Sequence, residues 1–144
     1  MRNYVLVAAV LLAGLVACAG KPQTVEATLE KGAGEMKSAI QRSVSDPGRR
    51  DKLLAHTDSL EAAMRGHAAD YAKFVDEFHR LNDAYDTPQE QIDAMFAAFE
   101  QKRQASRARL LDLHFQIIQL TSPQEWAPIG KAEVEMLQAL GTER

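Results

Sequence analysis

The chain has 144 residues, of which 46% are apolar, 17 are basic, 20 are acidic and one is cysteine. These values describe one small domain. They exclude a disulfide scaffold, a polytopic membrane protein, an intrinsically disordered chain and a strongly cationic nucleic-acid-binding protein.

The N-terminus has the three parts of an export signal. Arg2 supplies a positive charge, Tyr4 to Leu15 form an apolar stretch, and small and aliphatic residues precede Cys18. We therefore predict a signal peptide over residues 1–17. An uncleaved membrane anchor is the alternative, because the apolar run continues to Gly20 and lies at the short edge of what spans a hydrocarbon core.

The four residues at 15–18, Leu-Val-Ala-Cys, resemble the lipobox of bacterial lipoproteins. The resemblance implies cleavage before Cys18, acyl chains on Cys18 as a membrane anchor, and a place at the periplasmic face of the cell envelope. Neutral Ala19 implies transport to the outer membrane where the host has one. The expected organisation is a lipidated tether over 18–23 followed by a helical domain over 24–144.

The residues after the tether predict four helices. Three dipeptides combine a capping side chain with proline at the first helical position: Asp46-Pro47, Thr87-Pro88 and Ser122-Pro123. In the last two, a glutamate stands three residues after the cap and completes a capping box. The predicted helices cover residues 24–44, 47–85, 88–120 and 123–140, with Gly141 as the final stop.

The second and third predicted helices carry seams that advance in alternating steps of four and three residues, a period typical of supercoiled helices. The seams are Leu53, Thr57, Leu60, Met64, His67, Tyr71, Phe74, Phe78, Leu81, Tyr85 and Ile92, Phe96, Phe99, Arg103, Ser106, Leu110, Leu113, Ile117, Leu120. The link between the helices is short, so we predict an antiparallel hairpin in which seam residues whose numbers add to 173 or 174 face each other.

The predicted fold is all-α: a long antiparallel helical hairpin with two shorter helices packed on it, similar to a four-helix bundle. The apolar face of the third helix is wide only near its C-terminus. We therefore expect the short helices to cover the end remote from the turn. The turn end would project as a two-helix tip that carries Phe74, Phe78, Phe96, Phe99 and Tyr85.

Four polar residues interrupt the seams and predict one polar layer in the core: His67, Tyr71, Arg103 and Ser106, with Asp70 at its border. One interpretation is a ligand or metal site, or a histidine that responds to pH. The other is a hydrogen-bonded layer that fixes the helix register, as polar seam residues do in coiled coils. We favour the second, because the arginine repels a cation and a single histidine makes a poor site.

Motifs for catalysis, metals and cofactors are missing from the sequence. The four histidines, His56, His67, His79 and His114, include no pair three or four residues apart, and a second cysteine is lacking. There is no Gly-flanked serine and no Gly-rich phosphate loop. We predict no enzymatic activity, no cofactor and no metal. Gly32 and Gly34 indicate a weak turn or close helix packing.

The partner class follows from the surface pattern. Arg103, Arg107 and Arg109 are spread among acids and alanines, which is typical of a solvated face and not of nucleic-acid binding. The aromatic seam residues are either core or, where no helix covers them, a protein-binding surface.

Two segments, Leu-Thr-Ser-Pro-Gln at 120–124 and Thr-Pro-Gln-Glu-Gln at 87–91, resemble in part the Leu-Thr-x-x-Gln signatures of the periplasmic stress chaperone and sensor group that includes Spy and CpxP. That resemblance implies an antiparallel helical hairpin.

These observations predict a lipid-anchored envelope protein that acts as a non-enzymatic protein-binding, adaptor or chaperone-like module, with other envelope proteins as partners. Two alternatives stay open. One is a structural lipoprotein that self-associates as a homodimer. The other is a periplasmic metal or stress sensor.

Overall fold

A computed structural model describes residues 24–141, and within that range the chain folds into four helices with no strand. They are α2 (Val25–Ser43), α3 (Pro47–Asp83), α4 (Gln89–Gln119) and α5 (Pro123–Gly141). The all-α class is confirmed, and every predicted helix end lies within two residues of the observed one. The predicted signal peptide, the tether and Cys18 lie outside the described residues.

Two of the three predicted proline-containing helix starts have the expected cap. The Asp46 carboxylate accepts a hydrogen bond from the backbone N–H of Arg49 at 2.6 Å. At the start of α5, the N–H of Glu125 donates to the Ser122 hydroxyl at 3.3 Å, and the N–H of Ser122 donates to the Glu125 carboxylate at 2.8 Å. This reciprocal pair is the predicted capping box.

The predicted capping box at the start of α4 is wrong. Pro88 occupies the N-cap position, and no side chain caps the helix there. The Thr87 hydroxyl instead donates to the carbonyl of Leu81 at 2.7 Å. The last carbonyls of a helix have no partner within it, so the threonine satisfies the end of α3 and not the beginning of α4.

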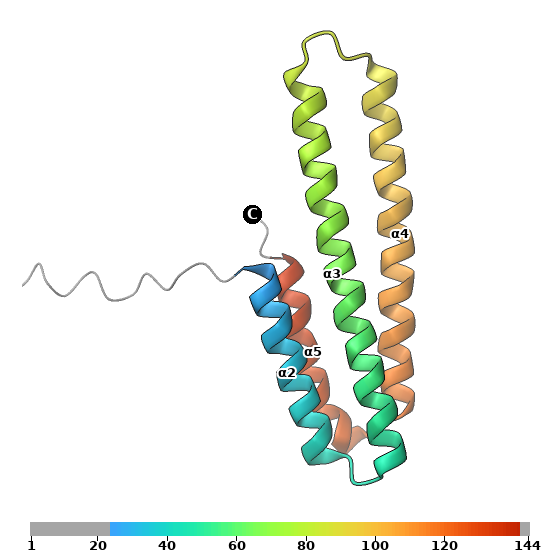
Figure 1. Cartoon of the computed structure of the whole chain (residues 1–144). Coiled ribbons are helices and arrows are strands. Elements are labelled where there is room, and N and C mark those ends of the chain that lie inside the picture. The colour runs from blue at the N-terminus through green and yellow to red at the C-terminus, as the bar shows by residue number, and fades with distance from the viewer. Residues whose placement is uncertain (1–23, 142–144) are drawn as a thin grey trace, which may run out of the picture.

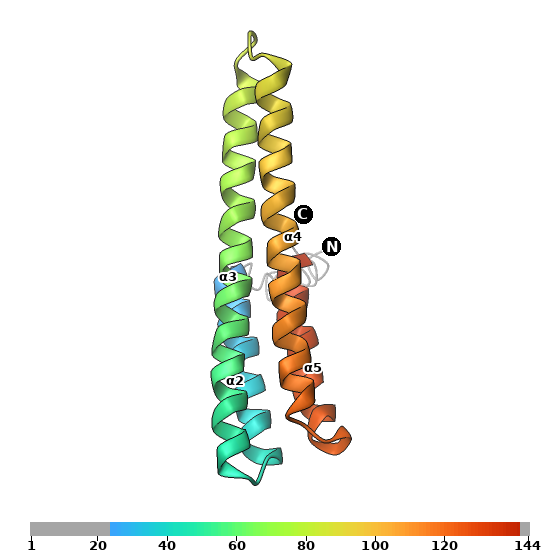
Figure 2. The same ribbon diagram turned by 90° about the vertical axis from the view of Figure 1, so that its right-hand side faces the viewer.

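Helices α3 and α4 form the predicted long antiparallel hairpin, and the shorter α2 and α5 lie beside the half remote from its turn (Figures 1 and 2). Helix α2 packs on both α3 and α5. We call this four-helix part the base. The tip is residues 71–103, the part of the hairpin that begins level with the end of α5 and includes the turn. The expected position of the short helices and the projection of the tip are confirmed.

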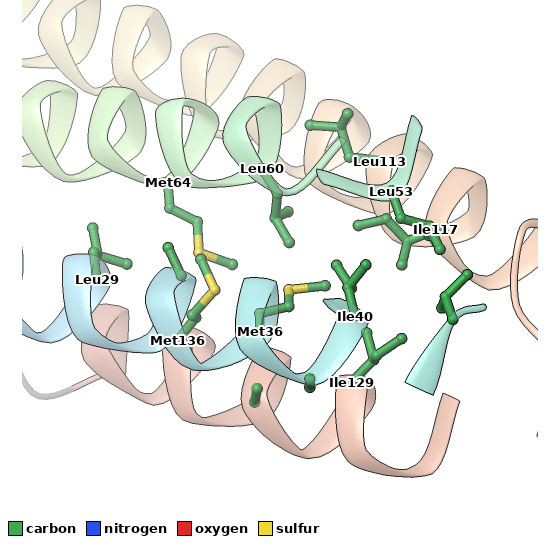
Figure 3. Close-up of a cluster of buried hydrophobic side chains, with 14 residues drawn as sticks. Leu29, Met36, Ile40, Leu53, Leu60, Met64, Leu113, Ile117, Ile129 and Met136 are labelled. Carbon is green, nitrogen blue, oxygen red and sulfur yellow. The ribbon is translucent and has the colours of Figure 1, made fainter. Parts of the chain in front are cut away.

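The hydrophobic core lies in the base and draws on all four helices (Figure 3). Its members are Leu29, Ala33, Met36, Ala39, Ile40, Val44, Leu53, Leu60, Met64, Leu113, Ile117, Ile129, Ala132 and Met136. None of them comes from the chain between Met64 and Leu113. The core therefore ends where the covering helices end.

Close packing explains one of the two glycines singled out in α2. A Cβ atom at Gly32 would lie only 3.3 Å from the Cα atom of Met136, so α2 and α5 approach each other closely at this point. The same atom at Gly34 would meet no neighbour within 4 Å. Neither glycine forms a turn, because α2 continues through both.

Candidate functional site: the hairpin tip

The tip is held together by aromatic rings at the predicted register. Phe74 and Phe99 stack with their ring centroids 4.1 Å apart and their planes at 18°. Phe78 and Phe96 meet edge to face with centroids 6.0 Å apart. Both are predicted facing pairs, so the register of the hairpin is confirmed here.

These rings are only partly covered. Leu81 is the one buried residue of the tip, at 4% exposure. Phe96 is 46% exposed and Tyr71 36% exposed, and the remaining phenylalanines of the tip are half-buried. Two helices alone cannot enclose an aromatic seam, because each ring retains one side toward solvent.

Tyr85 corrects the predicted seam. It lies in the turn, beyond the last residue of α3, and is fully exposed. A residue outside the helix has no facing position on α4, so its place in the seam is wrong. It remains part of the projecting tip, as expected.

The tip has two faces. On one, a groove of about 450 Å³ is floored by Phe74, Leu81, Met95 and Phe99 and bordered by charged residues that include Glu77. Tyr71, Phe78 and Phe96 do not line this groove. A second hollow of about 280 Å³ brings Tyr71 and Arg103 together with Leu140 of α5.

The second hollow locates the other face of the tip. Tyr71 and Phe78 are two helical turns apart, as are Phe96 and Arg103, so each pair shares one face of its helix. We call the face of the tip that bears Tyr71, Phe78 and Phe96 the inner face. It lies on the same side of the hairpin as α5 does in the base.

The four residues of the predicted polar layer gather at the edge of the base, but not inside a core. His67, Tyr71 and Arg103 line the hollow of about 280 Å³, and His67 and Ser106 line another of about 260 Å³. No hydrogen bond connects any two of them among the bonds of residues 24–141. Arg103 is exposed and binds Glu100 with 2.7 Å between Nε and Oε2. The layer is solvated because α2 and α5 end at this level.

Asp70, at the border of the predicted layer, has a different partner. Its carboxylate lies 3.1 Å from the Lys102 ammonium group, so this ion pair bridges α3 and α4. Arg109 pairs with Asp112 at 3.5 Å, while Arg107 is exposed. The arginines of α4 thus lie on a solvated face that also carries acids.

Two polar contacts in the base are not predicted by any pattern in the sequence. His114 Nδ1 lies 2.9 Å from both carboxylate oxygens of Glu133, which is only 3% exposed, and the histidine ring packs against Trp126 with centroids 5.6 Å apart. These residues belong to α4 and α5, and nothing in their spacing pairs them. The contact joins two helices.

The second contact is a bidentate pair, in which the Arg49 guanidinium donates to both carboxylate oxygens of Glu125 at 2.9 Å. These bonds, together with the backbone N–H of Ser122, hold the pKa of Glu125 at about 2. Arg49 also donates to the carbonyl of Leu120 at 3.1 Å. The capping box identified Glu125, but only the fold brings Arg49 to it.

A further groove of about 590 Å³ lies between α2 and α5. Glu35 and Glu135 line this groove, and the interaction between their carboxyl groups raises the pKa of Glu135 and lowers that of Glu35. The apolar part of its lining consists of small residues such as Ala39 and Pro128. Unlike the groove at the tip, its lining contains no aromatic side chain.

Within residues 24–141 no three His, Cys, Asp or Glu side chains lie close enough together to hold a metal ion. His67 and His114 have the neighbours described above, His56 is half-buried and His79 is exposed. Every buried side-chain nitrogen or oxygen of the described residues has a hydrogen-bond partner. None of the helices in this range is long and apolar enough to cross a membrane.

Comparison of the chain with protein-family models, curated protein sequences and solved structures gave no match. The site is therefore interpreted from its own chemistry: a projecting pair of helices with partly exposed aromatic side chains.

Proposed function

We propose that this protein is a lipid-anchored component of the bacterial cell envelope that binds another protein through the tip of its helical hairpin, without enzymatic activity. The observation that carries the proposal is the uncovered aromatic seam. The pattern that α2 and α5 cover in the base continues into the tip, where no described helix covers it.

The free energy available at this surface is substantial. Complete burial of a phenylalanine side chain contributes about 1.5–3 kcal/mol relative to its exposed state. Phe96 is nearly half exposed, and its neighbours Phe78 and Tyr71 are also partly open. Binding of a partner that covers the inner face would gain part of this burial free energy for each ring that it covers. Aromatic side chains are also the residues most enriched at the centres of protein interfaces.

The proposed anchor limits where the tip can reach. Six Cα–Cα steps separate Cys18 from Thr24, which caps α2, so a fully extended tether spans about 20 Å. Helix α2 begins near the middle of the hairpin's length, beside the start of the tip (Figure 1). Acylation at Cys18 would therefore hold the start of the tip within about 20 Å of the membrane, which favours partners that are themselves attached to it.

The resemblance of residues 120–124 and 87–91 to the Spy and CpxP signatures supports a chaperone-like or adaptor role, since those proteins are helical hairpins. The second of these segments spans the turn of the hairpin and the first residues of α4. The absence of sequence motifs for nucleophilic catalysis supports a non-enzymatic role.

The test compares proteins that co-purify with the acylated chain from solubilised membranes. Phe96→Asp places a charge on the inner face, and Leu111→Asp is the matched control, because Leu111 lies on the same helix and is 47% exposed. We expect the tip substitution to abolish capture of specific partners, the control to retain it, and Cys18→Ala to release the protein from the membrane. Equal capture by both aspartate variants would contradict the proposal.

A further inference from the structure

We propose that the partner of the tip is a second copy of this chain, and that two tips pair through their inner faces in antiparallel orientation. This inference rests on the proposed function, because it assigns an occupant to the same protein-binding surface.

The first argument is the architecture of the base. There, the seam of α3 and α4 is buried because two further antiparallel helices lie on it. In the tip the hairpin continues alone. A second tip placed face to face supplies the missing pair of antiparallel helices. The four helices of two tips would then form a bundle of the same kind as the base.

The second argument is the charge distribution along the hairpin. The distal segment, residues 76–93, has six acidic side chains and one basic one. The proximal segments, residues 65–73 and 100–109, have six basic side chains and two acidic ones. Phe96 lies between these regions, and Phe78, which it faces, lies within the distal segment near its start.

This pattern selects the orientation of the pair. In an antiparallel pair, the acidic end of each copy lies beside the basic band of the other, and two-fold symmetry repeats the favourable contact. In a parallel pair, acidic ends would face acidic ends. Charge complementarity therefore favours the antiparallel arrangement.

Several of these charges are free to act between copies. Asp83 and Asp86 at the distal end are exposed, as is Arg107 in the basic band. Lys73 is exposed too, but it lines the groove on the opposite face of the tip. Among the described residues, Asp83, Asp86 and Arg107 form no ion pair, whereas Lys102 and others of the band are already paired. These three residues also provide charge reversals that break no internal ion pair.

The area of the inner face determines how tightly two copies are expected to bind each other. Each tip helix contributes about 13–15 residues, or about 20 Å of length, and two helices side by side are about 20 Å wide. Such a footprint, about 400 Å² per copy, is smaller than that of a standard stable interface and typical of a weak one. We expect a dimer that dissociates on dilution, and attachment of both copies to one membrane would raise their effective concentration.

The first experiment measures the mass of residues 24–144, which contain every described core residue, by light scattering over a concentration series. We expect twice the monomer mass at high concentration. Phe96→Asp should weaken association at least about tenfold, since it buries an unpaired charge, while Leu111→Asp should not. Circular dichroism checks that each variant is folded. A wild-type chain that stays monomeric at every concentration would overturn the inference.

The second experiment tests the orientation with two charge-reversed variants. One carries Asp83→Lys and Asp86→Lys at the distal end, and the other carries Arg107→Glu in the band. Each variant alone should associate at least about tenfold more weakly, because like charges meet in both contacts. An equal mixture of the two should recover the dimer as a heterodimer. If the dimer forms when the distal variant is mixed with wild type, but not when the two variants are mixed, the pair is parallel and the proposed orientation is overturned.

The third experiment uses the full-length acylated protein in its membrane. His79→Cys introduces a thiol beside Phe78 near the centre of the proposed interface, and Ala62→Cys is the exposed control in the base. We expect a disulfide-linked dimer from the first variant and none from the second. Equal cross-linking of both would overturn the pairing.

The two proposals fail separately. If the chain does not self-associate but Phe96→Asp still abolishes capture of a different envelope protein, only the second copy is excluded as the partner. If neither self-association nor the capture of another envelope protein depends on the tip, the proposed function fails as well.

Discussion

The base and the tip contain the same helical hairpin with the same seam period, and they differ in what lies on it. In the base, α2 and α5 cover the seam, and leucine, isoleucine and methionine side chains are fully buried. In the tip the seam is richer in aromatic residues, yet only Leu81 is buried. The seam pattern thus determines which residues meet, while the number of helices around them determines whether water is excluded.

The difference has an energetic consequence. Removal of a fully enclosed side chain leaves a cavity that its neighbours can only partly fill. A side chain in a two-helix layer has solvent on at least one side, so the helices can close and water can replace the lost atoms. Matched substitutions in the two regions measure this difference directly.

The largest expected effect comes from Leu60→Ala in the base, where the leucine is 1% exposed. We expect a loss of about 2–5 kcal/mol in the free energy of unfolding. The same substitution at Leu81 in the tip should cost clearly less, because that residue lies outside the core cluster. Urea unfolding followed by circular dichroism provides both values. Equal losses would show that the tip is packed as tightly as the base.

The next effect concerns the contact between α2 and α5. Gly32→Ala should destabilise the protein by about 1–3 kcal/mol, because the new methyl group would crowd the Met136 side chain and backbone. Gly34→Ala should stabilise it by about 0.5–1 kcal/mol, since alanine favours helix and meets no neighbour there. Thermal unfolding measures the two shifts. If both changes have the same sign, the close approach of these helices is wrong.

A smaller and pH-dependent effect is expected for Glu125→Gln. The pKa of Glu125 in the folded protein is about 2, below its ordinary value of 4.5. Its charge therefore stabilises the folded state above about pH 4.5, and this contribution is lost as the pH falls toward 2. The variant should be less stable than wild type at pH 7 and equal to it near pH 2. Denaturant unfolding at both pH values tests the pairing with Arg49, and a difference that persists unchanged at pH 2 would contradict it.

The smallest expected effect on stability is that of a substitution at the border between the base and the tip. His67→Leu should raise the free energy of unfolding by less than about 1 kcal/mol, because the half-buried histidine makes no hydrogen bond with Tyr71, Arg103 or Ser106. Unfolding at pH 7.5 is the measurement. A marked loss of stability or of partner binding would show that the histidine has a specific role.

Much of this fold follows from local sequence. The Asp46-Pro47 and Ser122-Pro123 pairs predict where α3 and α5 begin, because capping depends on side chains within three residues of the backbone they bind. The seam period predicts the antiparallel register, which the Phe74–Phe99 stack confirms. The capping prediction is wrong only at Thr87, where the hydroxyl donates to the Leu81 carbonyl at the end of the preceding helix.

Other features depended on the tertiary structure. The Arg49–Glu125 and His114–Glu133 contacts join residues far apart in the chain, and no spacing rule connects them. The predicted polar layer became a surface patch because α2 and α5 stop beside it.

The sequence by itself determined the four helices, their ends and the residues that face each other across the hairpin, since these depend on local hydrogen bonding and on the helical repeat. Only the tertiary structure decided at which level of the seam the core ends, which leaves the polar residues at the surface. Burial depends on how far the covering helices extend along the hairpin, and that distance comes from the packing of all four helices.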